Sequence, residues 1–203
     1  MNSPSEVFRV NASPFSAFDA SSRVTAPSLV RWASDDPRSM RLATSCVPDA
    51  ASWALREISV VAARSADGEV ECYDVTENEH RDHILKISRA PAAISDALAA
   101  EARAIAGKIA TALDYVGVLA VEMFVVAGNG GPKVLVNEIA PRVHNSGHWT
   151  QDACVVSQFE QHIRAICGWP LGSTERHSNV VMHNILGGES ANWADYGASA
   201  HTG

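Results

Sequence analysis

Two glutamates, Glu122 and Glu138, each occur inside a run of apolar residues, where a carboxylate is unusual. Glu122 lies within VGVLAVEMFVV and Glu138 within KVLVNEIA, and the turn-forming sequence AGNGGP separates the two runs. Burying one charge in an apolar strand is costly, and burying two is more costly. A hard cation between the carboxylates would resolve this conflict, and Mg²⁺ takes carboxylate oxygens together with water and phosphate oxygens. The pair therefore predicts a magnesium site that serves a phosphate-containing ligand.

The expected pairing of the two strands would bring these glutamates together. Pairing of Val126 with Val134 across the turn defines an antiparallel register. In that register Glu122 lies opposite Glu138 on one face, where two like charges repel each other unless a cation lies between them. A register shifted by one residue is the alternative, and it would turn one glutamate outward or toward an arginine.

The segment after the second strand, PRVHNSGHW, is dense in polar side chains. Arginine can bind phosphate or carboxylate oxygens through two N–H groups, and Gly147 would let the backbone approach a ligand closely. A surface loop is the alternative, because turns favour Asn, Ser, Pro and Gly for local backbone reasons. The candidate ligand-binding residues are Asn137 beside the second glutamate and, beyond it, Arg142, His144, Asn145, Ser146 and His148.

A second polar group occurs earlier, in ENEHRDH, with a solvated loop as its alternative explanation. Its candidates are Glu77, Asn78, His80 and Arg81. The histidine pairs His80 with His83 and His144 with His148 also raise a zinc hydrolase as a hypothesis. No HExxH helix supports that hypothesis, and neither pair lies in an expected helix.

The scaffold that must position these groups begins near Glu57. EISVVAAR and EVECYDV are β-prone runs joined by SADG, whose Asp-Gly favours a hairpin. A polar loop from residue 76 and a short strand are expected next, followed by a helix over 95–114 with Ser95 as its N-cap. The residues expected on the packed stripe of that helix are Leu98, Ile105, Ile109 and Leu113.

A second helix is expected from Thr150 to about Cys167, and SNVVMHNILGG is typical of one more strand. The two glutamate-bearing runs are apolar on both faces, which indicates central strands. The order β-β-β-α-β-β-α-β favours an α+β fold with an antiparallel sheet backed by helices. The residues expected on the core side of the second helix are Cys154, Val155, Phe159, Ile163 and Ile166.

Composition excludes several classes of protein. The 203 residues are 46% hydrophobic, enough for a real core, and a formal net charge of −7 argues against a general nucleic-acid or anionic-membrane binder. No apolar run reaches membrane-span length and the N-terminus lacks a signal-peptide pattern, so we expect a cytoplasmic protein. Residues 1–50 are expected to be irregular, and residues 189–203 to form a loose tail. The cysteines, expected to be reduced thiols, are Cys46, Cys72, Cys154 and Cys167.

The chain from about Glu57 to Gly188 resembles one family, the ATP-grasp 5-(carboxyamino)imidazole ribonucleotide synthases of purine biosynthesis. The most specific stretch is VNEIAPRVHNSGHWTQDACVVSQFEQHIRAICGWPLGS. YVGVLAVEMFV, ENEHRDHIL, REISVVAAR and SNVVMHNILGG occur in the order that the family shows. The resemblance implies part of an ATP-grasp domain, over residues 51–188.

An activity and a set of residue roles follow from this resemblance. It implies an enzyme that uses MgATP to activate bicarbonate, as carboxyphosphate, and carboxylates the amino group of 5-aminoimidazole ribonucleotide. Family members tend to be dimers, which raises a homodimer here. In the implied roles, Glu122 and Glu138 hold magnesium, with Asn137 beside them, Glu57 binds the ATP ribose, and His80, Arg142, His144, Asn145 and Ser146 bind bicarbonate, its activated form and the ribonucleotide.

The sequence also departs from the family pattern. The family's N-terminal nucleotide-fold domain, its glycine-rich phosphate loop with a lysine and its C-terminal segment are not recognisable in these 203 residues. Phosphoryl transfer depends on positioning the phosphates, so the isolated chain is expected to bind MgADP weakly or not at all and to turn over ATP far more slowly than a full-length relative. The alternative function is a catalytically incompetent remnant or partner module with residual Mg-nucleotide binding.

Overall fold

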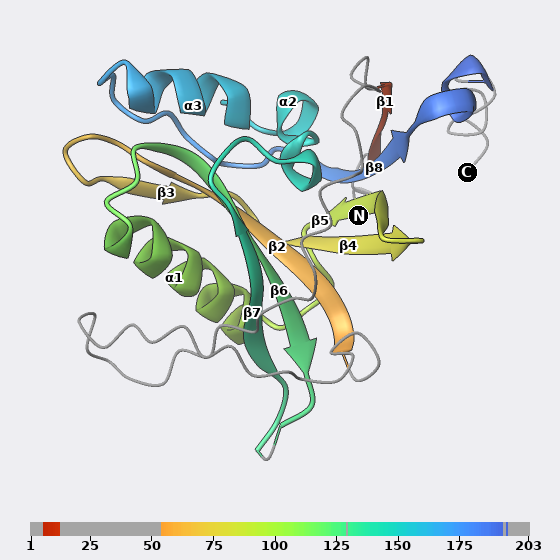
Figure 1. Cartoon of the computed structure of the whole chain (residues 1–203), viewed down its shortest axis with the longest axis horizontal. Coiled ribbons are helices and arrows are strands. Elements are labelled where there is room, and N and C mark those ends of the chain that lie inside the picture. The colour runs from red at the N-terminus through yellow and green to blue at the C-terminus, as the bar shows by residue number, and fades with distance from the viewer. Residues whose placement is uncertain (1–5, 13–53, 129, 193, 195–203) are drawn as a thin grey trace, which may run out of the picture.

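A computed structural model describes residues 6–12, 54–128, 130–192 and 194 (Figure 1). The strands are β1 (Glu6–Ala12), β2 (Ala54–Arg64), β3 (Val70–Cys72), β4 (Thr76–Arg81), β5 (Ile84–Ala90), β6 (Gly117–Val126), β7 (Lys133–Ala140) and β8 (Asn179–Ile185). The helices are α1 (Asp96–Ala112), α2 (Thr150–Ala153) and α3 (Gln158–Ile166), with short 3₁₀ turns η2 (Asn145–Gly147) and η3 (Gly187–Asn192). Among these residues, no helix is long and apolar enough to span a membrane.

One sheet contains all the strands, in the order β1-β8-β5-β4-β2-β6-β7, and β3 pairs with the end of β2. Every pairing is antiparallel except that of β1 with β8, which is parallel. The expected antiparallel sheet backed by helices is therefore confirmed. The hairpin expected at SADG is also confirmed, since β2 pairs with β3 across it.

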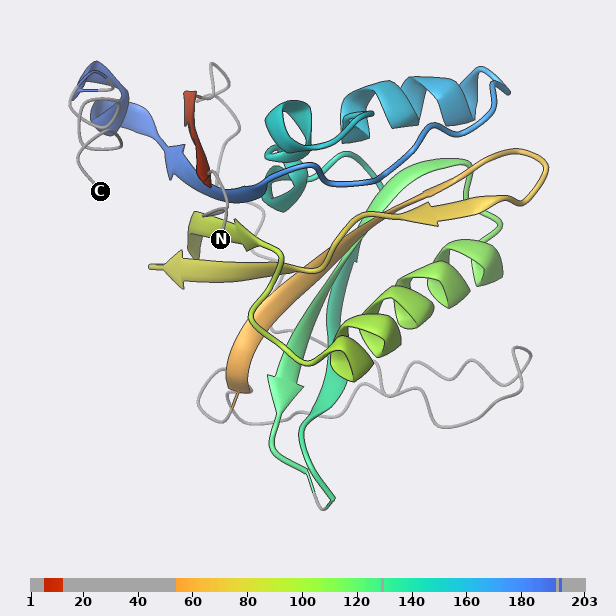
Figure 2. The same ribbon diagram turned by 180° about the vertical axis from the view of Figure 1, so that it is seen from behind.

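Two apolar layers lie on opposite sides of the central strands. Alternate residues of β2, such as Val60 and Ala62, pack with α1, whereas Val61 and Ala63 pack with the segment around Trp149 and Ala153. Figure 2 shows α1 lying along its side of the sheet, and α2 and α3 lie on the other side. This second side carries the candidate site.

Helix α1 forms where the sequence predicts it. The Ser95 side chain accepts a hydrogen bond from the Leu98 backbone N–H, which is the expected N-cap. Ile109 is buried and Leu98 and Ile105 are partly buried against the core, but Leu113 is 49% exposed. The predicted packing stripe therefore ends one turn early, because Leu113 is the C-cap residue and lies past the last helical turn.

Two expected boundaries are wrong. The polar stretch from Thr76 forms strand β4 instead of a loop, because its backbone pairs with both β2 and β5. The helix expected from Thr150 to Cys167 is two helices, since Cys154 is extended and pairs with Arg176. Ser157 then begins α3 by accepting a hydrogen bond from the Glu160 backbone N–H.

Of the residues predicted on the core side of the second helix, Cys154 is buried as expected, but the prediction is wrong for three others. Val155, Ile163 and Ile166 are 65%, 49% and 51% exposed. Gln158, Gln161 and Ala165 occupy the buried side of α3 instead. The two glutamines can be buried because their amides bond to backbone groups of neighbouring loops.

The first fifty residues contain one described strand. β1 pairs in parallel with β8, so residues 6–12 are not irregular as expected. Residues 13–53 and 195–203 lie outside the described residues, and the expectations for them stay predictions.

Candidate active site

The opposed glutamates lie on the sheet face turned toward η2 and α2. Glu122 of β6 pairs with Glu138 of β7, as the sequence predicts, and partners in an antiparallel pair project from the same face. The register that produces this pairing differs from the expected one. Val134 pairs with Val125, and a β-bulge at Asn137 then adds the one residue that brings the glutamates opposite each other.

Burial differs between the two carboxylates. The Glu122 side chain is 17% exposed, whereas Glu138 is an exposed residue, so the expectation that both are buried is wrong for Glu138. Loss of hydration, followed by repulsion from Glu138, raises the pKa of Glu122 above its usual range.

A carboxylate–imidazole contact lies on the same face as the two glutamates. His80 Nδ1 contacts Glu57 Oε2, with β2 and β4 paired beside them. This hydrogen bond, with smaller contributions from the charges of Glu57, Glu122 and Glu138, raises the pKa of His80. The structure thus brings the predicted residues of β2, β4, β6 and β7 into one electrostatic neighbourhood.

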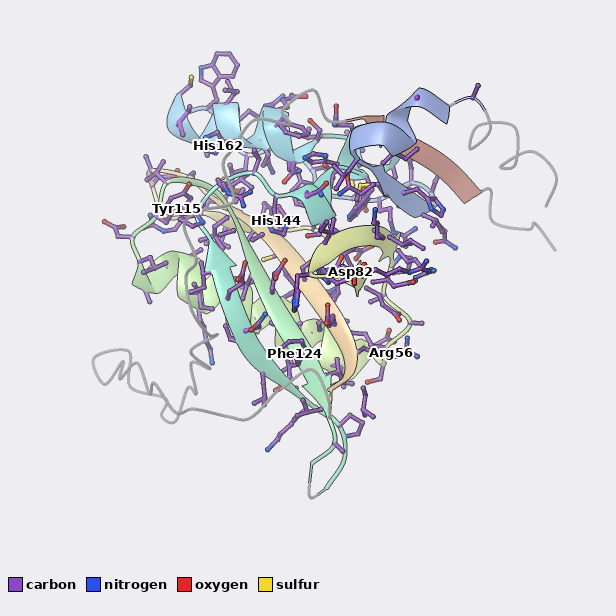
Figure 3. The ribbon with its side chains drawn as sticks, turned by 45° about the vertical axis from the view of Figure 1, so that its right-hand side comes forward. Arg56, Asp82, Tyr115, Phe124, His144 and His162 are labelled. Atoms are coloured by element: carbon purple, nitrogen blue, oxygen red, sulfur yellow. The ribbon has the colours of Figure 1, made fainter. Side chains whose placement is uncertain are left out.

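His144, labelled in Figure 3, is the N-cap residue of η2 and lies close to Glu122. Its Nε2 lies 3.4 Å from Glu122 Oε1, and its backbone N–H and C=O both bond to the Gln158 side chain. Burial, followed by repulsion from the Arg142 guanidinium, lowers the pKa of His144 to about 4. The imidazole is therefore neutral near pH 7 and can offer an N–H to a carboxylate without bringing a charge.

Three further predicted residues surround this imidazole. The Arg142 side chain is exposed, donates to the Val143 carbonyl and interacts electrostatically with both Glu122 and His144. The Ser146 hydroxyl lies 2.9 Å from His144 Nδ1. Asn145 Oδ1 is buried, and it has no hydrogen-bond partner among the residues that the structure describes. An unpaired buried oxygen is costly, which favours a ligand that donates to it.

The paired carboxylates fit a magnesium ion that a nucleotide brings. Mg²⁺ is commonly held by one or two protein carboxylates, with the remaining oxygens from water and phosphate. Over the described ranges, no group of three or more His, Cys, Asp or Glu side chains is arranged to hold a metal ion alone. Glu122 and Glu138 are therefore suited to a metal whose other ligands come from substrate.

Other polar residues singled out in the sequence do not join the site. Glu77 binds Arg56 through both carboxylate oxygens, at 2.6 and 2.7 Å. Arg81 binds Glu79. The His148 ring packs against Phe159, with ring centroids 5.3 Å apart. Three of the four histidines of the zinc hypothesis, His80, His144 and His148, thus have other contacts, and the described residues contain no zinc-type cluster.

Two further residues of the site, Ser59 and Gln158, are not indicated by the motifs of the sequence. Ser59 lies in the β-prone run EISVVAAR, yet it is fully buried and pairs with Glu122 across β2 and β6. Gln158, also fully buried, holds the backbone of His144. The signal for Gln158 was present in SQFE, a capping-box pattern that starts a helix at Ser157.

Comparison with known proteins shows which proteins this chain is similar to. The family model "ATP-grasp domain" matches residues 44–159. An N5-carboxyaminoimidazole ribonucleotide synthase of Brucella melitensis biotype 1 is 57% identical over 132 residues, which cover 65% of this chain and 36% of that relative. This chain therefore spans about a third of the relative's length.

Solved structures show the same likeness. The ADP complex of an N5-carboxyaminoimidazole ribonucleotide synthetase has a TM-score of 0.67 and 48% identity, covering 71% of this chain and 38% of that chain. An N5-carboxyaminoimidazole synthase of Aspergillus clavatus, in complex with ADP and 5-aminoimidazole ribonucleotide, has a TM-score of 0.66 and 36% identity, covering 72% and 40%. With more than half of its residues matched by the family model, the chain belongs to the ATP-grasp family.

Proposed function

We propose that this chain provides the metal and substrate face of an ATP-dependent ligase that carboxylates 5-aminoimidazole ribonucleotide with bicarbonate. The products would be 5-(carboxyamino)imidazole ribonucleotide, ADP and phosphate, in de novo purine biosynthesis. The observation that carries the proposal is the Glu122–Glu138 pair beside a neutral His144. The similarity to synthases of this name supports the choice of substrate.

Each carboxylate has a distinct role in this proposal. Glu122 and Glu138 hold Mg²⁺, with Asn137 beside them at the bulge, and the ion supplies charge neutralisation at the ATP phosphates. Glu57 accepts hydrogen bonds from the ATP ribose. His80, bonded to one Glu57 oxygen, fixes that carboxylate and leaves its other oxygen for a ribose hydroxyl.

The residues around η2 bind the reacting groups. Arg142 binds the anionic oxygens of bicarbonate and of its activated form, because a planar guanidinium can donate two parallel N–H groups to such oxygens. Asn145 Oδ1, unpaired within the described chain, accepts an N–H from the amino group of the ribonucleotide. His144 and Ser146 complete this wall of the site. Residues 51–188 form the ATP-grasp part of the chain in this proposal.

A chimera tests the proposal. The matching segment of the Brucella melitensis enzyme is replaced by the corresponding 132 residues of this chain, and carboxylation and ADP release are measured with each substrate omitted in turn. We expect ADP release that needs both bicarbonate and aminoimidazole ribonucleotide, at a rate within about tenfold of the parent enzyme. Misplacing the reacting groups by about 1 Å costs roughly a hundredfold in rate, so a loss of tenfold or less would mean that the exchanged segment holds them correctly. A folded chimera that hydrolyses ATP without either acceptor, or has no activity, would contradict the proposal.

A further inference from the structure

A continuous chain of hydrogen bonds runs through the buried face behind the site. It starts in β5, crosses β4 and β2 and ends at His144, the N-cap residue of η2, so it links segments far apart in sequence. The Nε2 of His144 in turn lies 3.4 Å from Glu122 Oε1 in β6. We call this series of contacts the polar chain, and its members in order are Ser88, Asn78, Ser59, Ser146, His144 and Glu122.

The links of the polar chain are short and shielded from water. Ser88 Oγ donates to Asn78 Oδ1 at 2.8 Å, and Asn78 Nδ2 donates to Ser59 Oγ at 2.9 Å. Ser59 Oγ donates to Ser146 Oγ at 2.8 Å. The three serines are 0% exposed, so water cannot take over these bonds, and each lost partner would leave a buried polar group unpaired.

The direction of the polar chain is determined at its His144 end. The Ser146 backbone N–H donates to His144 Nδ1 at 3.4 Å, and a backbone N–H can only donate. Nδ1 is therefore an acceptor, and the proton of the neutral ring lies on Nε2, which faces Glu122 Oε1. The Ser146 hydroxyl must then donate to Nδ1 and accept from Ser59.

The remaining links follow from the same count of donors. The Ser59 hydroxyl has one proton, which it gives to Ser146, so it must accept from the Asn78 amide nitrogen. Asn78 then presents its oxygen to Ser88, which donates. The Ser59 and Ser146 hydroxyls each accept one bond and donate one, so a reversal at either of them requires a reversal at its neighbours.

We propose that Ser59, Asn78 and Ser88 are positioning residues that hold His144 in the Nε2–H tautomer, with that N–H directed at the Glu122 carboxylate. A hydrogen bond from outside the metal's own ligands orients a ligating carboxylate. His144 would occupy one oxygen of Glu122 and leave the other for the metal. The role of these residues toward the metal rests on the proposed function, whereas the tautomer of His144 does not depend on that function.

Nitrogen NMR of the His144 imidazole, in the 203-residue protein without metal or nucleotide, tests the proposal. We expect a pyridine-type Nδ1 and a pyrrole-type Nε2 in the unsubstituted protein. The backbone bond to Nδ1 is long, at 3.4 Å, so most of the bias toward Nε2–H comes from the 2.9 Å bond of the Ser146 hydroxyl, which Ser59 keeps in its donating sense. In Ser59→Ala this hydroxyl is free to turn and accept from Nδ1–H, so the ratio of the tautomers should change about fivefold or more. Ser65→Ala is the matched control, because Ser65 is a buried serine directly after β2 that bonds within its own turn.

Ser88→Ala provides a second test if Ser59→Ala does not fold. Four hydrogen bonds separate Ser88 from the His144 ring, and the loss of Ser88 frees the Asn78 amide to turn and reverse the polar chain. A shift of the tautomer ratio in the same direction supports the proposal. A pyrrole-type Nδ1 in the unsubstituted protein would overturn it, as would imidazole spectra in both variants that match Ser65→Ala.

A second measurement separates this inference from the proposed reaction. In the chimera, Mn²⁺ affinity in the presence of ADP should weaken about tenfold with Ser59→Ala, the usual size of a loss behind a metal ligand. A changed tautomer ratio in the 203-residue protein, beside a chimera that binds no Mn·ADP, would leave the positioning role intact and count against the proposed function. Unchanged Mn·ADP affinity with a changed tautomer would refute the link to Glu122.

Discussion

Glu122 lies directly opposite Glu138 on the neighbouring strand, and the extra residue at the β-bulge, Asn137, is what aligns them. Glu122 is largely buried while Glu138 is exposed, so the repulsion acts on a carboxylate that already lacks much of its hydration. Such an arrangement costs stability in the metal-free protein, and binding of a cation between the carboxylates would relieve the repulsion.

Replacing Glu122 by Gln should stabilise the metal-free protein at neutral pH. The pKa of Glu122 is raised in the folded state, so between its unfolded and folded pKa values the folded protein binds more protons and stability falls as pH rises. Glutamine has the same shape and does not titrate. Urea unfolding from pH 4 to pH 8 should show a gain that is small in acid and grows toward neutral pH.

The control for that series is Glu101→Gln, at an exposed position of α1. Its unfolding free energy should follow the unsubstituted protein at every pH. A Glu122→Gln variant that is less stable than the unsubstituted protein at pH 7 would show that His144 or another partner compensates the Glu122 charge fully.

Gln158→Leu and Gln161→Leu should lose similar amounts of stability but differ at the site. Both glutamines are fully buried, and each bonds to a backbone N–H and C=O, those of His144 and of Gly172. Leaving two such groups unpaired costs about 2–4 kcal/mol in each variant, measured by denaturant unfolding. Only Gln158→Leu should change the His144 imidazole signals, and equal changes in both variants would contradict this assignment.

Gly147→Ala should destabilise the protein and disturb η2. A Cβ there would lie 2.7 Å from Val61 Cγ2 and 2.8 Å from Gln158 Oε1, so the turn or its neighbours must move. Overpacking of this kind costs about 1–3 kcal/mol. Gly107→Ala is the matched control, because its Cβ would have only an ordinary contact of 3.7 Å, and alanine in a helix gains about 0.5–1 kcal/mol. The melting temperature should fall in Gly147→Ala and rise in Gly107→Ala.

His80→Gln should cost more stability in mild acid than in base. The hydrogen bond to Glu57 raises the pKa of His80 in the folded state, so its contribution is complete below the unfolded pKa and is lost as pH rises through the folded pKa. The pair is partly exposed, so the effect should be at most about 1 kcal/mol. Unfolding at pH 5.5 and 8.5 measures it, with the exposed His177→Gln as control. A loss of stability in His80→Gln that is larger at pH 8.5 than at pH 5.5 would contradict a raised pKa of His80 in the folded state.

The opposition of the two glutamates could be predicted from sequence because two charged residues in apolar runs must find some compensation. The counting that led to it was wrong by one residue, and the bulge at Asn137 corrected the error. A bulge of one residue leaves no clear trace in a hydrophobic pattern, since the apolar period on either side of it stays intact.

The buried side of α3 shows a different limit. A helical pattern treats Ile163 and Ile166 as core and the glutamines as surface, yet the fold buries Gln158 and Gln161. Tertiary hydrogen bonds to loop backbone decide this, and the sequence does not reveal which loop will lie beside which helix. Ser59 was overlooked for the same reason, because its partners come from η2 and β4.

The position of a bound metal decides whether Glu122 and Glu138 form a metal site. Crystals of the chimera grown with Mn²⁺ and ADP would locate the ion by its anomalous scattering. We expect a manganese peak between the carboxylates of Glu122 and Glu138, with oxygen bonds near the roughly 2.1 Å typical of such hard cations. Nucleotide bound with its manganese away from both carboxylates would contradict the proposed site.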